Sequence, residues 1–280
     1  MFDMRYHIAS LVAVFLALTI GLLLGSLLVD KGILADQQEK IMKSITADVD
    51  KINERNADLQ LRLKELEHFQ SQVLPIAVKD RLTDKQVVVV TFTDEQVDLA
   101  RSIEKMIASS GATAFPLSIQ VDKLDFSDKN LVARLGSVFD ETGAQGGDFE
   151  RRFWNRFAKE VVGREPAALT GALIDQNLIS FDTSSIPAGN IVIVAATKKQ
   201  ARNRDLLFLE SFRQADATRI VGVEDRATRP SRVGAYKLRN ISTVDNIDEV
   251  AGKISLAYLL LNPDVTAHFG AKSTADRLLP

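Results

Sequence analysis

The chain has 280 residues, a formal net charge of −2 and no cysteine. The lack of cysteine excludes disulfide bonds, thiolate metal sites and cysteine nucleophiles, and the nearly neutral charge gives no indication of nucleic-acid binding. The length allows an N-terminal helical segment followed by one globular domain of about 200 residues.

The first segment, residues 8–29, contains no charged side chain and no proline. A helix of this length spans about 33 Å, enough to cross the hydrocarbon core of a bilayer. A signal peptide is the alternative, but its apolar region is about 7–15 residues long and ends at a small-residue cleavage site. The apolar run is longer and is followed by no such site, so we predict an uncleaved transmembrane anchor over residues 1–30.

From Met42 to Val73, within the predicted stalk of residues 31–74, mainly apolar side chains recur in a seven-residue repeat. Its d positions all hold branched aliphatic residues: Ile45, Ile52, Leu59, Leu66 and Val73. Asn56 occupies an a position, where two asparagines can pair across a parallel two-stranded coiled coil. The repeat predicts a coiled-coil stalk that forms a parallel homodimer. In the alternative, the apolar columns pack against the following domain of the same chain.

Small side chains recur every fourth residue in the predicted anchor. Gly21 and Gly25 form a GxxxG pattern, which allows two membrane helices to approach closely. Glycine and alanine are also common in membrane helices generally, so the pattern gains weight from the stalk that follows it. The predicted dimer interface consists of Ala17, Gly21, Gly25, Ile45, Ile52, Asn56, Leu59 and Leu66.

The charges that flank the anchor favour one orientation. Arg5 and the amino terminus precede the apolar run and outweigh Asp3, whereas Asp30 and Lys31 cancel on the other side. By the positive-inside rule, this difference of about one charge favours a cytoplasmic N-terminus. We therefore predict a single-pass protein of the cytoplasmic membrane with an extracytoplasmic C-terminal domain.

After Pro75, where we expect the stalk helix to end, apolar strands alternate with helices. We expect strands at 86–92, 113–119, 190–196 and 219–223, and helices at 95–109, 127–141, 148–162, 166–178, 205–215 and 248–261. Asp94 and Ser127 are the expected N-caps of the first two helices. Buried β-branched strands separated by helices are typical of a parallel sheet covered on both faces. The predicted fold class is α/β: a three-layer, mainly parallel, Rossmann-like domain over residues 80–270, with a C-terminal tail over 271–280.

The opening MFDMRYHIASLVAVFLALTIGLLLGSLL and the late segment ISTVDNID–GKISLAYLL resemble the mycobacterial copper transport protein B family, MctB. The resemblance covers essentially the whole chain in order, and its specific parts are RYH–SLVAVFLAL and STVDNID. It implies a membrane-associated protein of copper transport or copper homeostasis, and it provides no catalytic residues. Related actinobacterial members imply an alternative, a regulator of cell-envelope (peptidoglycan) enzymes at cell separation that works with a membrane-protein partner.

Residues that bind copper are few in this sequence. Copper(I) prefers sulfur ligands and copper(II) favours imidazole, and such groups are spread along the chain: Met1, Met4, Met42, Met106, His7, His68 and His268. His7 and Met4 can contact copper at the membrane edge, although His7 can equally be an ordinary interfacial histidine. We predict no metal site and no cofactor, leave direct copper contact open, and expect a dimeric scaffold with an indirect role in copper homeostasis.

Catalytic motifs are not indicated, because only His268 can lie in the globular domain and no phosphate-binding glycine motif is present. We therefore predict a protein that is not an enzyme. Ligands of open parallel sheets bind at the carboxyl ends of the strands. The predicted partner-binding residues there are Asp94, Lys198, Lys199, Glu224, Asp225 and Arg226.

Asp245 and Asp248 precede the last predicted helix, and they either cap it or belong to the same binding surface. The loops at this edge carry charges of both signs. Such charges favour a polar peptide or protein partner over a small apolar ligand. The alternative is that strand ends are polar in any protein.

Overall fold

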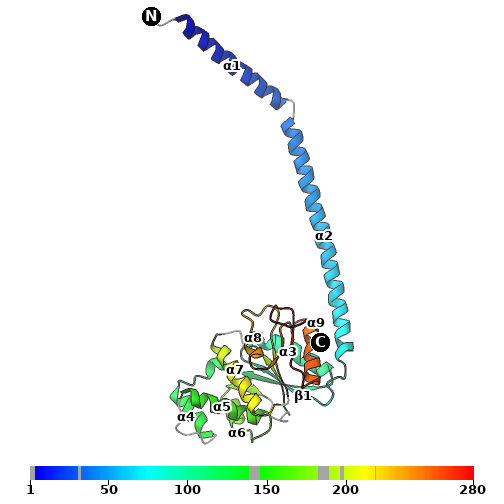
Figure 1. Ribbon diagram of the computed structural model, residues 1–280, viewed down its shortest axis with the longest axis vertical. Coiled ribbons are helices and arrows are strands. Elements are labelled where there is room, and N and C mark those ends of the chain that lie inside the picture. The colour runs from blue at the N-terminus through cyan, green and yellow to red at the C-terminus, as the bar shows by residue number, and fades with distance from the viewer. Residues whose placement is uncertain (1–3, 31–32, 139–145, 182–188, 196–198, 218) are drawn as a thin grey trace. The chain divides into compact units, whose positions relative to one another are not determined.

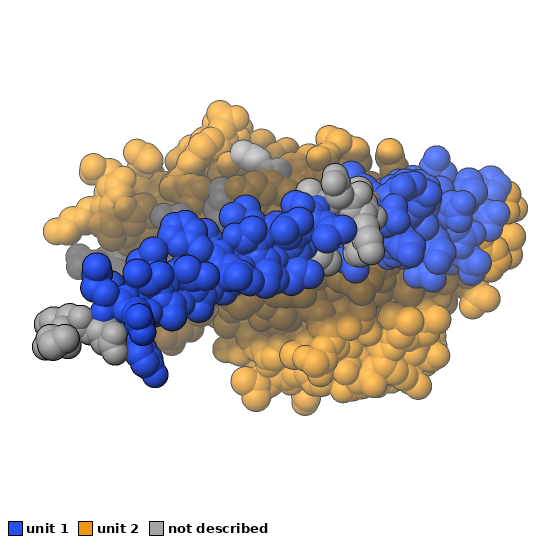
Figure 2. Space-filling model, turned by 90° about the horizontal axis from the view of Figure 1, so that it is seen from above, with its two compact units in different colours: residues 1–68 blue, residues 69–280 orange. Residues whose placement is uncertain are grey.

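The computed structural model describes residues 4–30, 33–138, 146–181, 189–195, 199–217 and 219–280 (Figure 1). The chain divides into two compact units, residues 1–68 and residues 69–280, which are coloured separately in Figure 2. Below they are called unit 1 and unit 2.

Unit 1 contains helix α1 (Met4–Asp30) and most of helix α2 (Ile33–Val78). Every described side chain of residues 4–27 and 36–68 is exposed. Among the described helices, one is long and apolar enough to cross a membrane, the segment Met4–Leu27. Along α2, ion pairs one helical turn apart join Glu39 to Lys43 and Asp58 to Arg62.

Helix α2 continues through Pro75 to Val78, so the expectation that the helix ends at Pro75 was wrong. Proline removes one backbone donor, which usually interrupts a helix. Here the lost hydrogen bond is offset by packing, because Val78 is fully buried and Leu74 and Ala77 pack against the same apolar cluster of unit 2. The backbone N–H of Lys79 still donates to the carbonyl of Pro75.

Unit 2 contains a seven-stranded sheet in the order β3-β2-β1-β4-β5-β6-β7. Strands β1 (Gln86–Thr91), β2 (Thr113–Ile119), β4 (Asn190–Val194) and β5 (Arg219–Val223) confirm the expected strands. Three short strands were not predicted: β3 (Ile179–Phe181), β6 (Ser242–Val244) and β7 (His268–Phe269). All neighbouring pairs are parallel except β2 and β3. The predicted mixed α/β class with a mostly parallel sheet is confirmed.

The helices of unit 2 lie between these strands in the sequence, with α4, α5 and α6 in succession between β2 and β3. They are α3 (Val97–Ser109, after the 3-10 turn η1, Asp94–Gln96), α4 (Lys129–Val138, after η2, Val121–Lys123), α5 (Gly146–Val161), α6 (Ala168–Asp175), α7 (Lys199–Gln214), α8 (Val233–Lys237) and α9 (Val250–Leu261). Helix α8 was not predicted. The expectation that Ser127 caps α4 was wrong, because Asp128 Oδ1 accepts the bond from the Asn130 N–H, whereas the Ser127 hydroxyl donates to Asp125.

Alternate residues of the central strands contribute to two separate apolar clusters. Val88, Val90, Ile191 and Ile193 join an aromatic cluster contributed mainly by α5 and α7, which includes Phe153, Trp154, Phe157, Phe208 and Phe212. Val87, Val89, Val192 and Val194 join the other cluster, with side chains of α3 and α9. Because successive side chains of a strand point to opposite faces, both faces of the sheet are buried.

Candidate functional site

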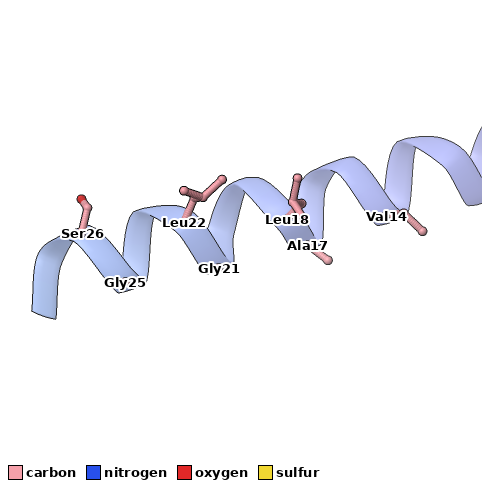
Figure 3. Close-up of a pocket in the computed structure, with 7 residues that line it drawn as sticks. All are labelled: Val14, Ala17, Leu18, Gly21, Leu22, Gly25 and Ser26. Atoms are coloured by element: carbon pink, nitrogen blue, oxygen red, sulfur yellow. The ribbon is translucent and has the colours of Figure 1, made fainter.

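The predicted interface residues of the anchor lie on α1. Figure 3 shows Ala17, Gly21 and Gly25 along one helix face, with Val14, Leu18, Leu22 and Ser26 beside them. A Cβ atom added at Gly21 or Gly25 would meet no atom within 4 Å. Packing within the described chain therefore does not require glycine at either position.

The predicted interface residues of the stalk lie on α2. Ile45, Ile52, Leu59 and Leu66 are 53%, 55%, 56% and 50% exposed, and Asn56 is exposed as well. The described chain leaves this column of aliphatic side chains uncovered.

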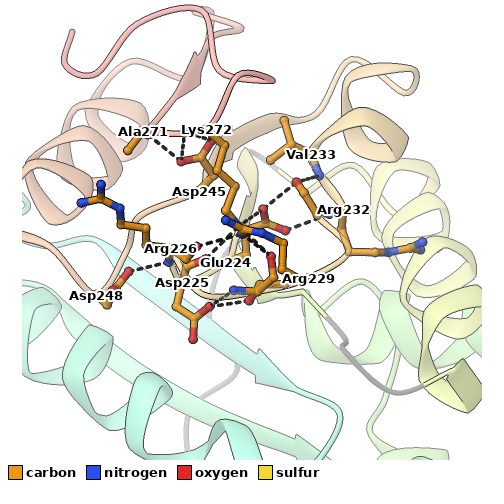
Figure 4. Close-up of polar contacts among 12 residues, drawn as sticks. Glu224, Asp225, Arg226, Arg229, Arg232, Val233, Asp245, Asp248, Ala271 and Lys272 are labelled. Carbon is orange, nitrogen blue, oxygen red and sulfur yellow. Dashed lines mark hydrogen bonds and ion pairs between the residues drawn. The ribbon is translucent and has the colours of Figure 1, made fainter. Parts of the chain in front are cut away.

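The polar residues predicted at the carboxyl edge are brought together by strands β5 and β6 (Figure 4). Glu224, Asp225 and Arg226 follow β5 directly, while Asp245 and Asp248 follow β6. The Arg226 backbone N–H donates to Asp248 Oδ1 at 2.9 Å, which ties the two loops together.

The remaining predicted residues are Asp94, Lys198 and Lys199. Asp94 begins η1 after β1, and Lys199 begins α7, but their side chains lie outside the described part of the structure. Lys198 lies outside the described residues altogether.

Glu224 points into the protein and is 2% exposed. Its Oε1 atom lies 2.6 Å from Lys272 Nζ and accepts a bond from the Ser231 hydroxyl, and its Oε2 atom accepts from the Arg232 N–H at 2.8 Å. Lys272 Nζ also donates to the carbonyls of Asp225 and Thr228. A buried charge needs such partners, so Glu224 fixes the loops in place and does not present a carboxylate to solvent.

Asp245 is fully buried and also holds a loop. Its Oδ1 atom accepts a bond from the Ala271 N–H at 2.7 Å, and both carboxylate oxygens lie 3.3 Å from the Lys272 N–H. Gly270 allows this close approach, because its φ is +151° and a Cβ atom there would overlap Asp245 Oδ1. The loop after β7 is thus bound to the end of β6.

The alternative that Asp245 and Asp248 cap the last helix is wrong. The residue that precedes α9 is Glu249, and its side chain makes no capping hydrogen bond. Asp245 binds the amides of the loop after β7, and Asp248 binds the amide of Arg226. Both carboxylates are used to join loops, which is a role that needs residues distant in sequence.

The exposed part of this edge carries the Arg226 side chain. Arg226 Nη1 lies 2.7 Å from Glu249 Oε1, and this contact raises the pKa of the guanidinium. Burial acts to raise the pKa of Glu249, but the hydrogen bonds from Arg226 and Asn246 outweigh it and hold that pKa below its ordinary value. Asp225 accepts bonds from the backbone and hydroxyl of Thr228, each at 2.5 Å.

Sequence reasoning missed Lys272, Ser231 and Thr228. Lys272 lies 48 positions from Glu224 in the sequence and falls in the segment predicted as a tail. A strand end followed by acidic residues signals this edge, but no local pattern identifies the distant lysine that neutralises one of them.

Among the described residues, Met4 and His7 are the potential copper ligands that lie one helical turn apart, and both are exposed on α1. Met42 is exposed on α2, whereas Met106 is buried in the core and lies 3.6 Å from the Ser110 hydroxyl. His268 is buried in β7, 3.0 Å from Thr243 Oγ1, and burial together with nearby Lys237 lowers its pKa. Among the described residues, no group of three or more histidine, cysteine, aspartate or glutamate side chains could hold a metal ion.

Comparison with known proteins relates the whole chain to one family. The family described as "Copper transport outer membrane protein, MctB" matches residues 1–280. The protein named copper transporter MctB from Mycobacterium tuberculosis (strain ATCC 25618 / H37Rv) is 24% identical over 311 residues, covering 96% of this chain and 96% of the relative. The protein of the same name from Mycobacterium leprae (strain TN) is 25% identical over 290 residues, covering 91% and 90% of the two chains.

Proposed function

The chain belongs to the MctB family, and from this premise we propose that it is a membrane-anchored, non-enzymatic scaffold that supports copper homeostasis without conducting copper itself. The names of its relatives describe copper transport. The observation that carries the indirect role is the arrangement of potential ligands: Met4 and His7 are exposed on α1, Met42 and His68 are exposed and far apart on α2, and Met106 and His268 are buried in unit 2. Copper would accordingly be handled by a partner.

The composition of the membrane anchor also argues against copper conduction by this chain. Helix α1 is composed mainly of alanine, glycine, leucine and valine, and a single helix of this kind offers no polar path for an ion. Its N-terminus would lie in the cytoplasm and unit 2 outside the cytoplasmic membrane, an orientation supported by Arg5 and the amino terminus. The family names mention copper transport and no envelope enzyme, so the alternative role in cell-envelope regulation gains no support from them.

The scaffold would be a parallel homodimer joined by a coiled-coil stalk. The support for this is the half-exposed aliphatic column at Ile45, Ile52, Leu59 and Leu66. Burying one such side chain fully stabilises an assembly by about 1.5–3 kcal/mol. A second copy would cover four of these side chains at once, while the face at Ala17, Gly21 and Gly25 would allow the anchors to approach.

The partner would contact the carboxyl edge of the sheet in unit 2. The strand order of β3-β2-β1-β4-β5-β6 resembles that of doubly wound, Rossmann-like folds, which supports the predicted layering and the choice of this edge. Arg226, which is exposed, would contact the partner, together with the residues predicted from the sequence, Asp94, Lys198 and Lys199. Glu224, Asp245 and Asp248 would act by shaping the loops.

Copper tolerance and metal content test this proposal together. A strain lacking the protein should grow less well in copper, and the wild-type gene should restore growth. The full chain purified in detergent should contain well under one copper ion per chain when measured by inductively coupled plasma mass spectrometry. Unchanged copper tolerance would contradict the role in homeostasis. Stoichiometric copper in the purified chain would contradict the indirect mechanism.

A further inference from the structure

A polar pocket of about 340 Å³ lies between the loop that follows β5 and the loop that follows β7. Besides Ala271, its lining consists of three basic and three hydroxyl side chains: Arg226, Arg229, Lys272, Ser231, Ser273 and Thr274. We propose that this pocket binds the phosphate group of a small phosphate monoester. This site goes beyond the proposed role in copper homeostasis and does not depend on it.

The three basic side chains that line the pocket are held in different ways. Glu224 neutralises Lys272, and Glu249 neutralises Arg226, through contacts of 2.6 and 2.7 Å. Arg229 is held differently, because its Nη1 atom donates to the carbonyls of Arg226 and Thr228 at 2.9 and 2.8 Å. Within the described ranges Arg229 has no carboxylate partner. Neutral carbonyls orient its guanidinium and leave its charge available to an anion.

The pocket is formed before any ligand arrives. Lys272 is anchored by Glu224 and by the carbonyls of Asp225 and Thr228. Asp245 holds the backbone amides of Ala271 and Lys272 on the opposite wall (Figure 4). When the loops of a pocket are already ordered, ligand binding does not carry the free-energy cost of ordering them. The buried carboxylates thus hold the loops that form the pocket in place.

The lining chemistry favours phosphate. A guanidinium presents parallel N–H donors that match two oxygens of a phosphate, and charge-assisted bonds of this kind are stronger than neutral ones. The hydroxyls of Ser273 and Thr274 add donors for further oxygens. The volume lies at the lower end of the range for small-molecule sites, so the pocket suits a phosphate with a small polar body. Both a soluble phosphate ester and a phosphatidic acid headgroup present this chemistry.

Binding measurements with the full chain in a neutral detergent test the site. Isothermal titration calorimetry with inorganic phosphate and with glycerol 3-phosphate, at constant ionic strength, should show saturable binding to the wild type. Arg229→Gln should weaken it about tenfold, which corresponds to the loss of one charge-assisted hydrogen bond. Arg213→Gln is the matched control, since Arg213 is an exposed arginine near the end of α7, paired with Glu210 at 2.6 Å. This control should bind like the wild type.

A second pair of measurements separates the sources of the phosphate and guards against misfolding. Vesicles of phosphatidylcholine with or without phosphatidic acid replace the soluble esters. Binding only to phosphatidic acid vesicles, lost in Arg229→Gln, supports the site with a lipid ligand. Arg229→Lys and Thr274→Val should each retain the native melting temperature and bind more weakly than the wild type. Equal binding by the wild type, Arg229→Gln and Arg213→Gln, or no binding to any probe, would overturn the proposal.

Discussion

Leucine side chains have opposite environments in the two units of this protein. In unit 1, Leu59 on α2 is 56% exposed, whereas Leu209 on α7 of unit 2 is fully buried among aromatic rings. A helix satisfies its backbone hydrogen bonds within itself, so α1 and α2 can be helical while their apolar faces remain uncovered. A strand bonds only to neighbouring strands, so the sheet exists only with its covering helices in place. Within unit 1 itself, these apolar side chains therefore remain uncovered.

Glycines show the same contrast. At Gly21 in α1, an added Cβ atom would meet nothing within 4 Å. At Gly222 in β5, an added Cβ atom would overlap the ring of Tyr236. Unit 2 requires this glycine for its own packing, whereas nothing in the described chain requires the glycine of the anchor.

The largest expected effect comes from truncating the two leucines in turn. Leu209→Ala should destabilise unit 2 by about 2–5 kcal/mol, because it leaves a cavity in a packed core. Leu59→Ala should change the stability of unit 2 by less than about 0.5 kcal/mol. Urea unfolding followed by the fluorescence of Trp154 reports on unit 2 alone, since the chain has one tryptophan and it lies in this core. Equal losses in both variants would break the contrast between the units.

A crosslinking experiment tests what covers unit 1. The chain has no cysteine, so Leu59→Cys introduces a single thiol. As Leu59 is a d position, mild oxidation in membranes should give a disulfide-linked dimer. Leu61→Cys is the matched control, an f position that is similarly exposed and would face away from the partner. A dimer on non-reducing gels from the first variant alone is the expected result, and equal crosslinking of both would contradict a coiled-coil seam.

The smallest effect concerns a buried charge in unit 2. Burial raises the pKa of Asp205 above its ordinary value of 3.8, although the bonds from Arg232 and Tyr236 oppose this. The folded state therefore binds the proton more readily than the unfolded state. The stability contributed by this group falls as the pH rises from 3.8 through the raised pKa of the folded state.

Asp205→Asn removes this titration. The stability of the wild type relative to the variant should decline between acid and neutral pH, as measured by urea unfolding at a series of pH values. If the wild type instead gained stability relative to the variant over this range, the pKa of Asp205 in the folded state would not be raised.

Local patterns in the sequence determined the parts of this protein that depend on neighbours in sequence. The charge-free run at 8–29 and the heptads after it mark the helices of unit 1. Strands β1, β4 and β5 each contain a run of apolar residues, and apolar residues alternate with others along β2; all four strands were predicted. The family resemblance rested on contiguous segments as well. These features need no knowledge of distant residues, because hydrogen bonding and periodicity act over a few positions.

Tertiary structure alone decided the features that join distant residues. Strands β6 and β7 are too short for a local signal and exist because β5 offers unpaired backbone groups to β6, and β6 to β7. Helix α2 passes Pro75 because the core of unit 2 buries Val78. The sequence placed Glu224 at the carboxyl edge, but its inward direction depends on Lys272 from the last segment of the chain. A buried carboxylate needs hydrogen-bonding or cationic partners, and the fold of the chain decides which distant residues supply them.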